Sequence, residues 1–291
     1  MYLELNTQVP TAPPRAAATV VMLRDGAQGL EVFLVRRHGL SDVLGGAWVF
    51  PGGKVDASDA ELDATHHLDQ PLEDLHSQLG EPDLSVLDAV SLYVAAVREA
   101  FEECGVLFSP GADPATAMAW LREGRSFAEV LELLRLRLDT QALVPWSRWI
   151  TPRVPSVSSK RFDTRFFVAT VPPGQAATHD NREATESLWL PPRAALERYW
   201  ANTLPLAPPQ IMSLAHLSHF ASAADVLQAA RSRRPPVIQP EPYQLDDGRL
   251  ICYPGDPQHP VAERALPGPT RLYYRNKRFE ADGGLDAFFN D

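Results

Sequence analysis

Residues 87–106, LDAVSLYVAAVREAFEECGV, contain the clearest helical pattern in the chain. Apolar side chains recur there at steps of three and four residues, which places them on one face of an α-helix. They are Leu87, Val90, Val94, Val97, Phe101 and Cys104. Gly105 follows directly, and glycine is typical of a helix end. The stretch therefore predicts a helix over 87–104 with one buried face.

Three glutamates lie roughly opposite the apolar face of this predicted helix. Glu99, Glu102 and Glu103 are spaced so that their carboxylates lie side by side and repel one another. A divalent cation would turn this repulsion into coordination, because Mg²⁺ prefers carboxylate oxygens together with water and substrate phosphate. Arg98 directly precedes the cluster and could hold a carboxylate by a charge-assisted hydrogen bond. A solvated acidic helix face is the alternative interpretation.

Two segments together resemble the Nudix box, the signature of the Nudix hydrolases. Phe50-Pro51-Gly52-Gly53 is similar to its opening and follows a short predicted strand, and REAFEECGV at 98–106 is similar to its second half. Arg98 lies 45 residues after Gly53, a much longer interval than in the usual box. A helical segment at about 59–86 is therefore interpreted as an insertion, and Asp59 stands where the box usually has a glutamate.

The inserted box is similar to one subgroup, that of the peroxisomal acyl-coenzyme A diphosphatases. The same subgroup resembles the chain at 149–152 (WITP), 160–167 (KRFDTRFF) and 204–210 (LPLAPPQ). The resemblance implies an α/β Nudix fold, in which a mixed β-sheet is sandwiched between helices. It also implies hydrolysis of a diphosphate with Mg²⁺ or Mn²⁺, and CoA or acyl-CoA as the substrate, cleaved to 4′-phosphopantetheine and 3′,5′-ADP. In the usual CoA pattern an arginine stands at the position of Asp42.

Two alternatives stay open beside this interpretation. A Nudix hydrolase could instead cleave ADP-ribose or a dinucleotide such as NADH. A catalytically silent Nudix-like binding module is the alternative from another class, although such a module has no reason to keep three mutually repelling glutamates. Hydrolysis of any diphosphate in the presence of metal separates the enzymes from the silent module.

The resemblance implies roles for the residues of the box. Glu99, Glu102 and Glu103 would ligate the metal ion, and Arg98 would orient them. Glu102 or Glu103 would be the general base. Glu183, in a later loop, is another candidate for the base, and a solvated loop charge is its alternative interpretation.

A further set of residues is expected to contact the substrate. The bare backbone of a glycine pair allows a phosphate to approach closely, and basic side chains can hold a phosphate. The expected residues are Gly52, Gly53, Arg37, Lys160, Arg161 and Arg165. Alternation along a strand places Arg161, Asp163 and Arg165 on one face, so an internal ladder of ion pairs is an equally good account of these arginines.

The remaining pattern divides the chain into three parts. Residues 1–16 are predicted to be a Pro-rich arm, 17–231 the Nudix domain, and 232–291 an irregular C-terminal extension with one strand at 271–274. Further strands are predicted at 18–23, 31–36, 143–151, 161–171 and 187–190. Helices are predicted at 114–122, 127–138 and 193–200, and from 208 to about 231.

Composition excludes several classes of function. With 27 basic and 37 acidic residues in 291, the net charge of −10 argues against binding of nucleic acid. No run reaches the roughly 20 apolar residues that span a bilayer, and no signal peptide is recognised at the N-terminus. Two cysteines make no disulfide framework. We therefore expect a cytoplasmic protein with a small-molecule diphosphate substrate and no membrane partner; the sequence leaves the oligomeric state open.

Overall fold

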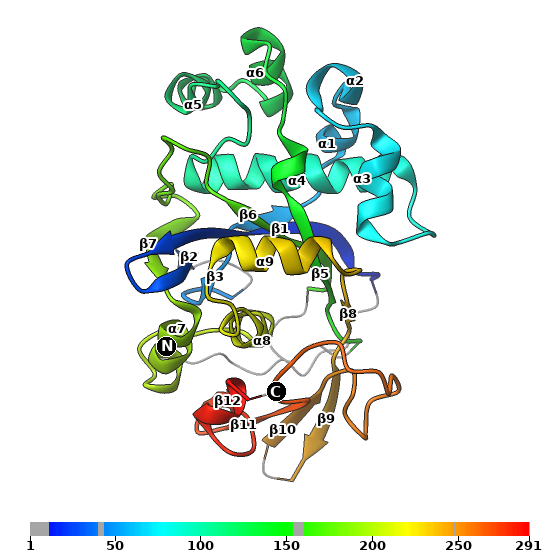
Figure 1. Ribbon diagram of the computed structural model, residues 1–291, viewed down its shortest axis with the longest axis vertical. Helices are drawn as coiled ribbons and strands as arrows, with labels where there is room; N and C mark the ends of the chain where they lie inside the picture. Colours follow the sequence, from blue (N-terminus) through cyan, green and yellow to red (C-terminus); the bar gives the residue numbers. More distant parts are fainter. Residues whose placement is uncertain (1–11, 40–43, 154–159, 247, 291) are drawn as a thin grey trace.

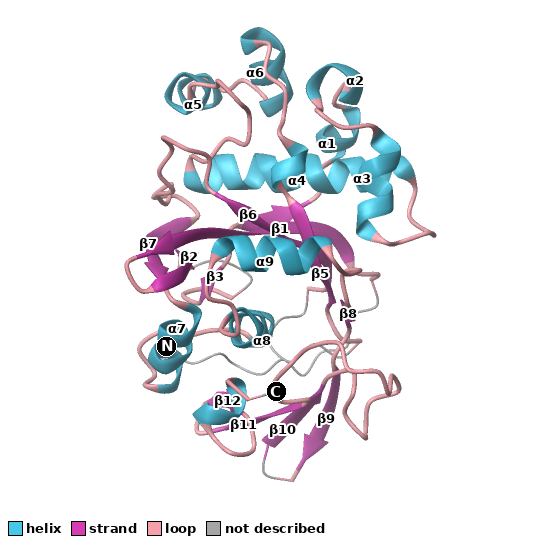
Figure 2. Cartoon of the chain, in the orientation of Figure 1, coloured by secondary structure: helices cyan, strands magenta, loops and turns pink. Residues whose placement is uncertain are grey.

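An eight-stranded mixed sheet forms the centre of the protein (Figures 1 and 2). The computed structural model describes residues 12–39, 44–153, 160–246 and 248–290. Strands follow the order β3-β2-β1-β6-β5-β8, with β4 paired to β1 and β7 paired to β2. Strand β1 is antiparallel to β2 and parallel to β6. Their bounds are β1 (Arg15–Gly26), β2 (Gly29–Arg37), β3 (Trp48–Val49), β4 (Gly52–Lys54), β5 (Val144–Ile150), β6 (Phe162–Thr170), β7 (Ala184–Leu190) and β8 (Val237–Ile238).

Helices cover both faces of this sheet, as predicted. On one side lie α1 (Ala57–Glu61), α2 (Ala64–His67), α3 (Leu72–Leu79), α4 (Val86–Cys104), α5 (Pro114–Arg122) and α6 (Phe127–Leu134). On the other side lie α7 (Pro192–Trp200), α8 (Pro208–Leu217) and α9 (Ala223–Arg231). Alternation along β1 serves both layers, because Ala18 and Val20 join the core with α4 while Val21 and Leu23 join the opposite core.

Helix α4 confirms the predicted helical period. It is buried on more than the single apolar face that the pattern predicted. The Ser85 hydroxyl accepts a hydrogen bond from the backbone amide of Asp88 at the N-terminus, and Gly105, with φ 70°, ends the helix. Every residue from 89 to 98 is buried, because the sheet and the insertion enclose the helix. Leu87, predicted on the buried face, is 64% exposed. It belongs to the first turn, which extends beyond the core.

The insertion between the halves of the box is helical, as predicted, and packs along α4. Leu62, Leu68, Leu75 and Leu79 join the same core as α4. The insertion is also tied to the segment after α6, where the His67 ring Nδ1 lies 2.9 Å from the Leu136 carbonyl oxygen. The position of the insertion is therefore set by the packing of its four leucines against α4.

The C-terminal part is more regular than predicted. The segment predicted to be helical from 208 to about 231 forms two helices, α8 and α9, which are separated by residues 218–222, where Ser222 caps α9. Beyond β8, a four-stranded antiparallel sheet contributes side chains such as Phe279 to the core around α8. Its strands are β9 (Glu241–Leu245), β10 (Gly248–Cys252), β11 (Arg271–Arg275) and β12 (Arg278–Glu280). Only the strand at 271–274 was predicted.

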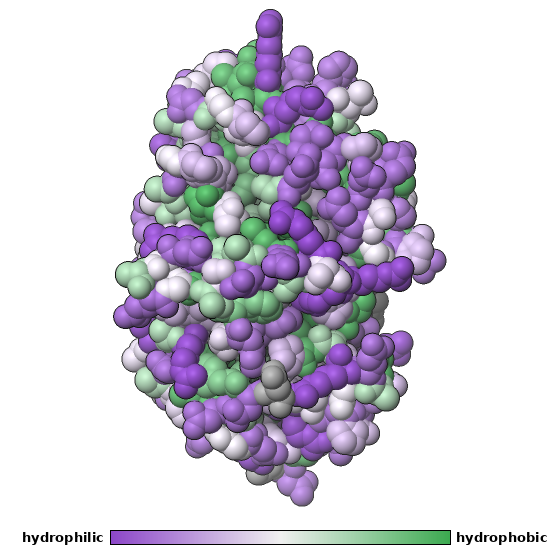
Figure 3. Space-filling view, in the orientation of Figure 1, coloured by the Kyte–Doolittle hydropathy of each residue, from purple (hydrophilic) through white to green (hydrophobic). Residues whose placement is uncertain are grey.

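Two features concern the ends and the surface. Strand β1 begins at Arg15, so the last residues of the predicted arm are part of the sheet, and 1–11 lie outside the described residues, as does Asp42. No helix in the described part of the chain has the length and apolar character needed to cross a membrane. Figure 3 shows hydrophilic side chains over most of one face, with smaller apolar areas between them.

Candidate active site

The two glycines of the box bring the backbone of β4 against the carboxylates of α4. The backbone amide of Gly52 donates to Glu103 Oε2 at 3.0 Å. Gly52 has φ 153°, and a Cβ there would meet the backbone of β1 at Ala18 and Thr19. A Cβ on Gly53 would instead meet the carboxyl group of Glu99. Glycine is therefore needed at both positions, because side chains there would displace β1 or Glu99.

Arg98 holds the cluster together from a buried position. Its Nε and Nη2 donate to the two carboxylate oxygens of Asp59 at 2.7 and 2.9 Å, and Asp59 is itself buried. Its Nη1 donates to Glu99 at 2.8 Å and to Glu102 at 3.2 Å. Asp59, which stands where the box usually has a glutamate, is therefore a bidentate partner of Arg98.

Burial and mutual repulsion raise the pKa values of the three glutamates. Burial raises the pKa of Glu99 to about 7, against the opposing effect of Arg98, and burial together with the charge of Glu99 raises that of Glu103 to about 8. The pKa of Glu102 is also raised by burial. Arg98 and Arg37 offset this effect only in part, and a bound cation would relieve the remaining repulsion.

The loop before β7 brings Glu183 to the same place. Its negative charge raises the pKa values of Glu99 and Glu103, so it lies within electrostatic range of both. The loop is held by Asp180, whose carboxylate accepts hydrogen bonds from the backbone amides of residues 182, 183 and 184. The structure thus gathers Glu183 with the box residues, although Glu183 is 80 positions away from Glu103 in the sequence.

Arg37 also belongs to this cluster. Its positive charge lowers the pKa of Glu103. Within the described part of the chain its Nε is buried and has no hydrogen-bond partner. A buried guanidinium donor without a partner is costly, and an anionic ligand would satisfy it.

The basic residues around β6 do not join the cluster. Arg165 is buried, and its Nε and Nη2 donate to the carboxylate of Glu81 at 2.9 and 2.5 Å, with Asp163 at 3.0 Å from its Nη1. Arg161 donates to the backbone carbonyls of Thr151 and Pro152. The expectation that Arg165 holds a phosphate is therefore corrected, because its donors are taken up by ion pairs within the fold, as the alternation of charges also allowed.

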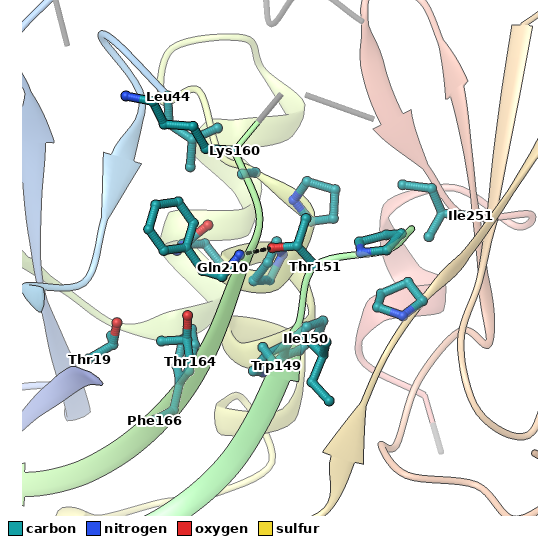
Figure 4. A pocket seen from close by; sticks show the side chains of 16 residues that line it. Thr19, Leu44, Trp149, Ile150, Thr151, Lys160, Thr164, Phe166, Gln210 and Ile251 are labelled. Carbon is teal, nitrogen blue, oxygen red and sulfur yellow. Dashed lines mark hydrogen bonds between the residues drawn. The ribbon is translucent and has the colours of Figure 1, made fainter. Parts of the chain in front are cut away.

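Lys160 lies elsewhere, at an apolar cavity of about 210 Å³ between the sheet and the start of α8 (Figure 4). Trp149 and Phe166 of β5 and β6 face this cavity, together with Pro208 and Gln210. Thr19 forms part of the wall and pairs with Gly52 across β1 and β4. Gly52 donates to Glu103, but Trp149 and Phe166 of the cavity belong to the core on the α8 side of the sheet, and α4 lies on the other side.

A second and more polar space, an open cleft of about 630 Å³, lies at the end of α4. Glu102 and Glu183 both line it, opposite Arg122 and Arg125 of α5 and the following turn. Arg182 comes from the loop before β7. Sequence reasoning missed these arginines, because they belong to no motif and meet only through the folding of two separate segments. The insertion at 59–86 contributes no residue to the described walls of the cleft.

The carboxylates fit a metal ion by chemistry, although their present arrangement does not form a closed set of ligands. Among the described residues, no group of three or more His, Cys, Asp or Glu side chains is positioned to hold a metal ion. Glu99 and Glu102 are turned to Arg98, and Glu103 to the Gly52 amide. Carboxylate oxygens such as those of Glu99, Glu102 and Glu103 are nevertheless the donors that a hard divalent cation prefers.

Comparison with known proteins agrees with this geometry. The family model of the NUDT19 Nudix domain matches residues 7–217. The chain is 28% identical over 275 residues to the acyl-coenzyme A diphosphatase NUDT19 of Xenopus laevis, covering 79% of this chain and 71% of that protein. For the human protein of the same name the identity is 28% over 272 residues, covering 79% and 72%.

A solved structure supports the same assignment. The crystal structure of a Nudix hydrolase from Alicyclobacillus acidocaldarius is similar with a TM-score of 0.62 at 30% identity, covering 77% of this chain and 98% of that one. Its fold agrees with the mixed sheet between helices described above. The chain belongs to the Nudix hydrolases, in the family of the NUDT19 Nudix domain.

Proposed function

We propose that this Nudix diphosphatase cleaves the diphosphate of CoA or acyl-CoA to give 4′-phosphopantetheine and 3′,5′-ADP. The relatives in Xenopus and human are named acyl-coenzyme A diphosphatases. The observation that carries the proposal is the apolar cavity whose wall includes Thr19, the strand partner of Gly52. A pantetheine arm is long and largely uncharged, and an apolar cavity is the kind of space that such an arm needs.

The glutamates of α4 would hold the metal ion. Nudix hydrolases generally use divalent metal ions, and Mg²⁺ or Mn²⁺ suits oxygen donors. When bound, the metal neutralises the diphosphate charge and lowers the pKa of the attacking water. We assign Glu99, Glu102 and Glu103 as ligands. Arg98, fixed by Asp59, keeps Glu99 and Glu102 in place.

Two further residues would act on the substrate and on the water. The Arg37 Nε, buried without a partner among the described residues, donates to a diphosphate oxygen. Glu183 lies on an exposed loop within range of Glu99 and Glu103, so it can accept the proton of the attacking water and release it to solvent. Gly52 and Gly53, without side chains, let β4 lie against β1 and against the carboxyl group of Glu99, beside which the diphosphate would bind.

A substrate panel tests this function. CoA, acetyl-CoA, a long-chain acyl-CoA, ADP-ribose and NADH are incubated with the protein and Mg²⁺ or Mn²⁺, and the products are identified by mass spectrometry. We expect 3′,5′-ADP from CoA and no product when the metal is chelated. Faster hydrolysis of ADP-ribose or NADH than of any CoA ester contradicts the substrate but not the chemistry. Absence of hydrolysis with every substrate favours a silent binding module.

A further inference from the structure

The cleft at the end of α4 gathers three arginines beside the proposed catalytic carboxylates. Arg122 ends α5, Arg125 follows it, and Arg182 comes from the loop that also carries Glu183. Glu102, Asp180 and Glu183 line the same cleft. Whether the arginines can hold an anion therefore depends on which of these charged groups already have partners within the protein.

Two of these arginines have no partner in the described part of the chain. Arg122 and Arg182 are exposed, and their guanidinium groups make no hydrogen bond or ion pair with another described residue. Arg125 is held over the ring of Trp120 at 5.2 Å, and its Nε is 3.9 Å from a Glu123 oxygen. Arg125 is therefore held near the cleft, and the other two offer their donors to solvent or to a ligand.

The carboxylates of the same cleft are used in other ways. Glu102 accepts a hydrogen bond from Arg98, and Asp180 accepts three from the backbone of its loop. Glu183 faces Glu99 and Glu103 closely enough to raise their pKa values. Glu102 and Asp180 thus have partners other than the arginines of the cleft, and among the described residues no ion pair joins Glu183 to Arg122 or Arg182, which leaves these two for an external anion.

We propose that Arg122, Arg125 and Arg182 bind a phosphate monoester carried by the ribose of the substrate, beside the diphosphate. The planar guanidinium group of arginine matches the geometry of phosphate oxygens. The monoester carries negative charge of its own, separate from the charge of the diphosphate at the glutamates. This inference rests on the proposed function for one point only, the position of the diphosphate at Glu102 and Glu183. These arginines take the role of phosphate contact that the sequence suggested for Arg165, whose guanidinium group donates to Glu81 instead.

The geometry divides the substrate between two spaces. The apolar cavity beside Thr19 takes the uncharged arm, and the arginine cleft, which Glu102 and Glu183 also line, takes the phosphorylated nucleoside. A ribose phosphate occurs at the 3′ position in CoA and at the 2′ position in NADPH. The shared chemistry is a ribose phosphate monoester, and the experiment must separate the two positions.

The first experiment measures binding without turnover. Isothermal titration calorimetry, with metal chelated and at low ionic strength, compares 3′,5′-ADP, 2′,5′-ADP and 5′-AMP. We expect the wild-type protein to bind 3′,5′-ADP at least about tenfold more tightly than AMP. In the Arg122→Gln/Arg182→Gln variant this preference should fall to about twofold or less. Arg231→Gln, which removes an exposed arginine from α9 on the other face of the sheet, should retain it.

The second experiment measures the same discrimination in hydrolysis. The ratio of kcat/KM for CoA to that for dephospho-CoA, and for NADPH to that for NADH, is determined for the wild type and each variant. We expect the ratio of CoA to dephospho-CoA to fall close to one in the double variant and to stay at the wild-type value in Arg231→Gln. Arg122→Lys, which keeps the charge but loses the planar guanidinium group, should give an intermediate ratio.

The outcomes separate this inference from the proposed function. If CoA is hydrolysed but dephospho-CoA is hydrolysed equally well, the arginine site is wrong and the function stands. If nothing is hydrolysed but the wild type prefers a bisphosphate and the double variant does not, the site stands and the function falls. Preference for the 2′-phosphate keeps the site and overturns CoA as its source. A preference that persists in the double variant overturns the assignment to these arginines.

Discussion

Replacing each of the two adjacent glycines of the box by alanine should have different effects: Gly52→Ala should mainly lower stability, and Gly53→Ala should mainly lower kcat. In Gly52→Ala, the new Cβ would lie 2.6 Å from the Thr19 Cα and closer still to the Ala18 carbonyl oxygen, both in the backbone of β1. Residue 52 also has φ 153°, which an alanine rarely adopts. In Gly53→Ala, the new Cβ would lie 2.5 Å from the carboxyl carbon of Glu99, the movable end of a side chain.

The structure gives the expected magnitudes. Gly52→Ala combines backbone strain of about 1–3 kcal/mol with overpacking of about 1–3 kcal/mol, so the free energy of unfolding should fall by about 2–6 kcal/mol. Gly53→Ala only moves Glu99, so the free energy of unfolding should change by about 1 kcal/mol or less. Its kcat should fall by about 10²-fold, because a ligand displaced by about 1 Å no longer holds the reacting groups in place.

Two measurements on each variant test this reasoning. Urea unfolding followed by tryptophan fluorescence gives the free energy of unfolding, and steady-state hydrolysis of CoA at saturating Mg²⁺ gives kcat. For Gly53→Ala, the Mg²⁺ concentration needed for half-maximal activity should also rise, since Glu99 is one of the proposed ligands. The reasoning is refuted if Gly53→Ala retains wild-type kcat, or if it destabilises the protein as much as Gly52→Ala does.

Further predictions concern charges of the site and of the core. Glu103→Gln should lower kcat by about 10²-fold or more with an unchanged circular dichroism spectrum, and near-normal turnover with Mg²⁺ would show that Glu103 is no ligand. Asp59→Ala should lower the free energy of unfolding by about 3–5 kcal/mol in urea, because it leaves the buried Arg98 without its main partner; a loss below about 1 kcal/mol contradicts this. Burial lowers the pKa of His216 to about 3 from 6.5, so the unfolded chain takes up a proton below pH 6.5 while the folded chain does not. Stability should therefore fall as the pH drops from 6.5 towards 3, and His216→Phe, measured by urea unfolding at pH 7 and pH 5, should weaken this dependence; an equal loss in the variant assigns it to other groups.

The candidate site was only partly accessible from the sequence. The spacing of Glu99, Glu102 and Glu103 placed them together, because neighbours at three and four residues always meet on a helix. The glycines were recognised as a bare stretch of backbone, yet nothing in the spacing showed that Gly52 would bind Glu103 directly. Asp59 could not be assigned by pattern, since its contact with Arg98 joins residues 39 positions apart.

The basic residues also show that the sequence alone does not identify which side chains contact the substrate. Arg161 and Arg165 are close to a family motif, and they were expected near a phosphate. The fold pairs Arg165 with Glu81, 84 positions away, and leaves Arg122 and Arg182 beside the carboxylates instead. Charge alone does not tell which arginine is neutralised within the protein, because this depends on the acidic group that the fold brings to it.

The sequence by itself determined the features that depend on near neighbours. These include the period of α4, its end at Gly105 and the strands at 18–23, 31–36, 143–151 and 161–171. Hydrogen bonding and side-chain direction repeat within a few residues in these elements, so their pattern is visible in the order of residues. Only the tertiary structure decided the exposure of Leu87, the C-terminal sheet, the partner of Arg98 and the arginine cleft, because each depends on contacts that form when distant segments pack together.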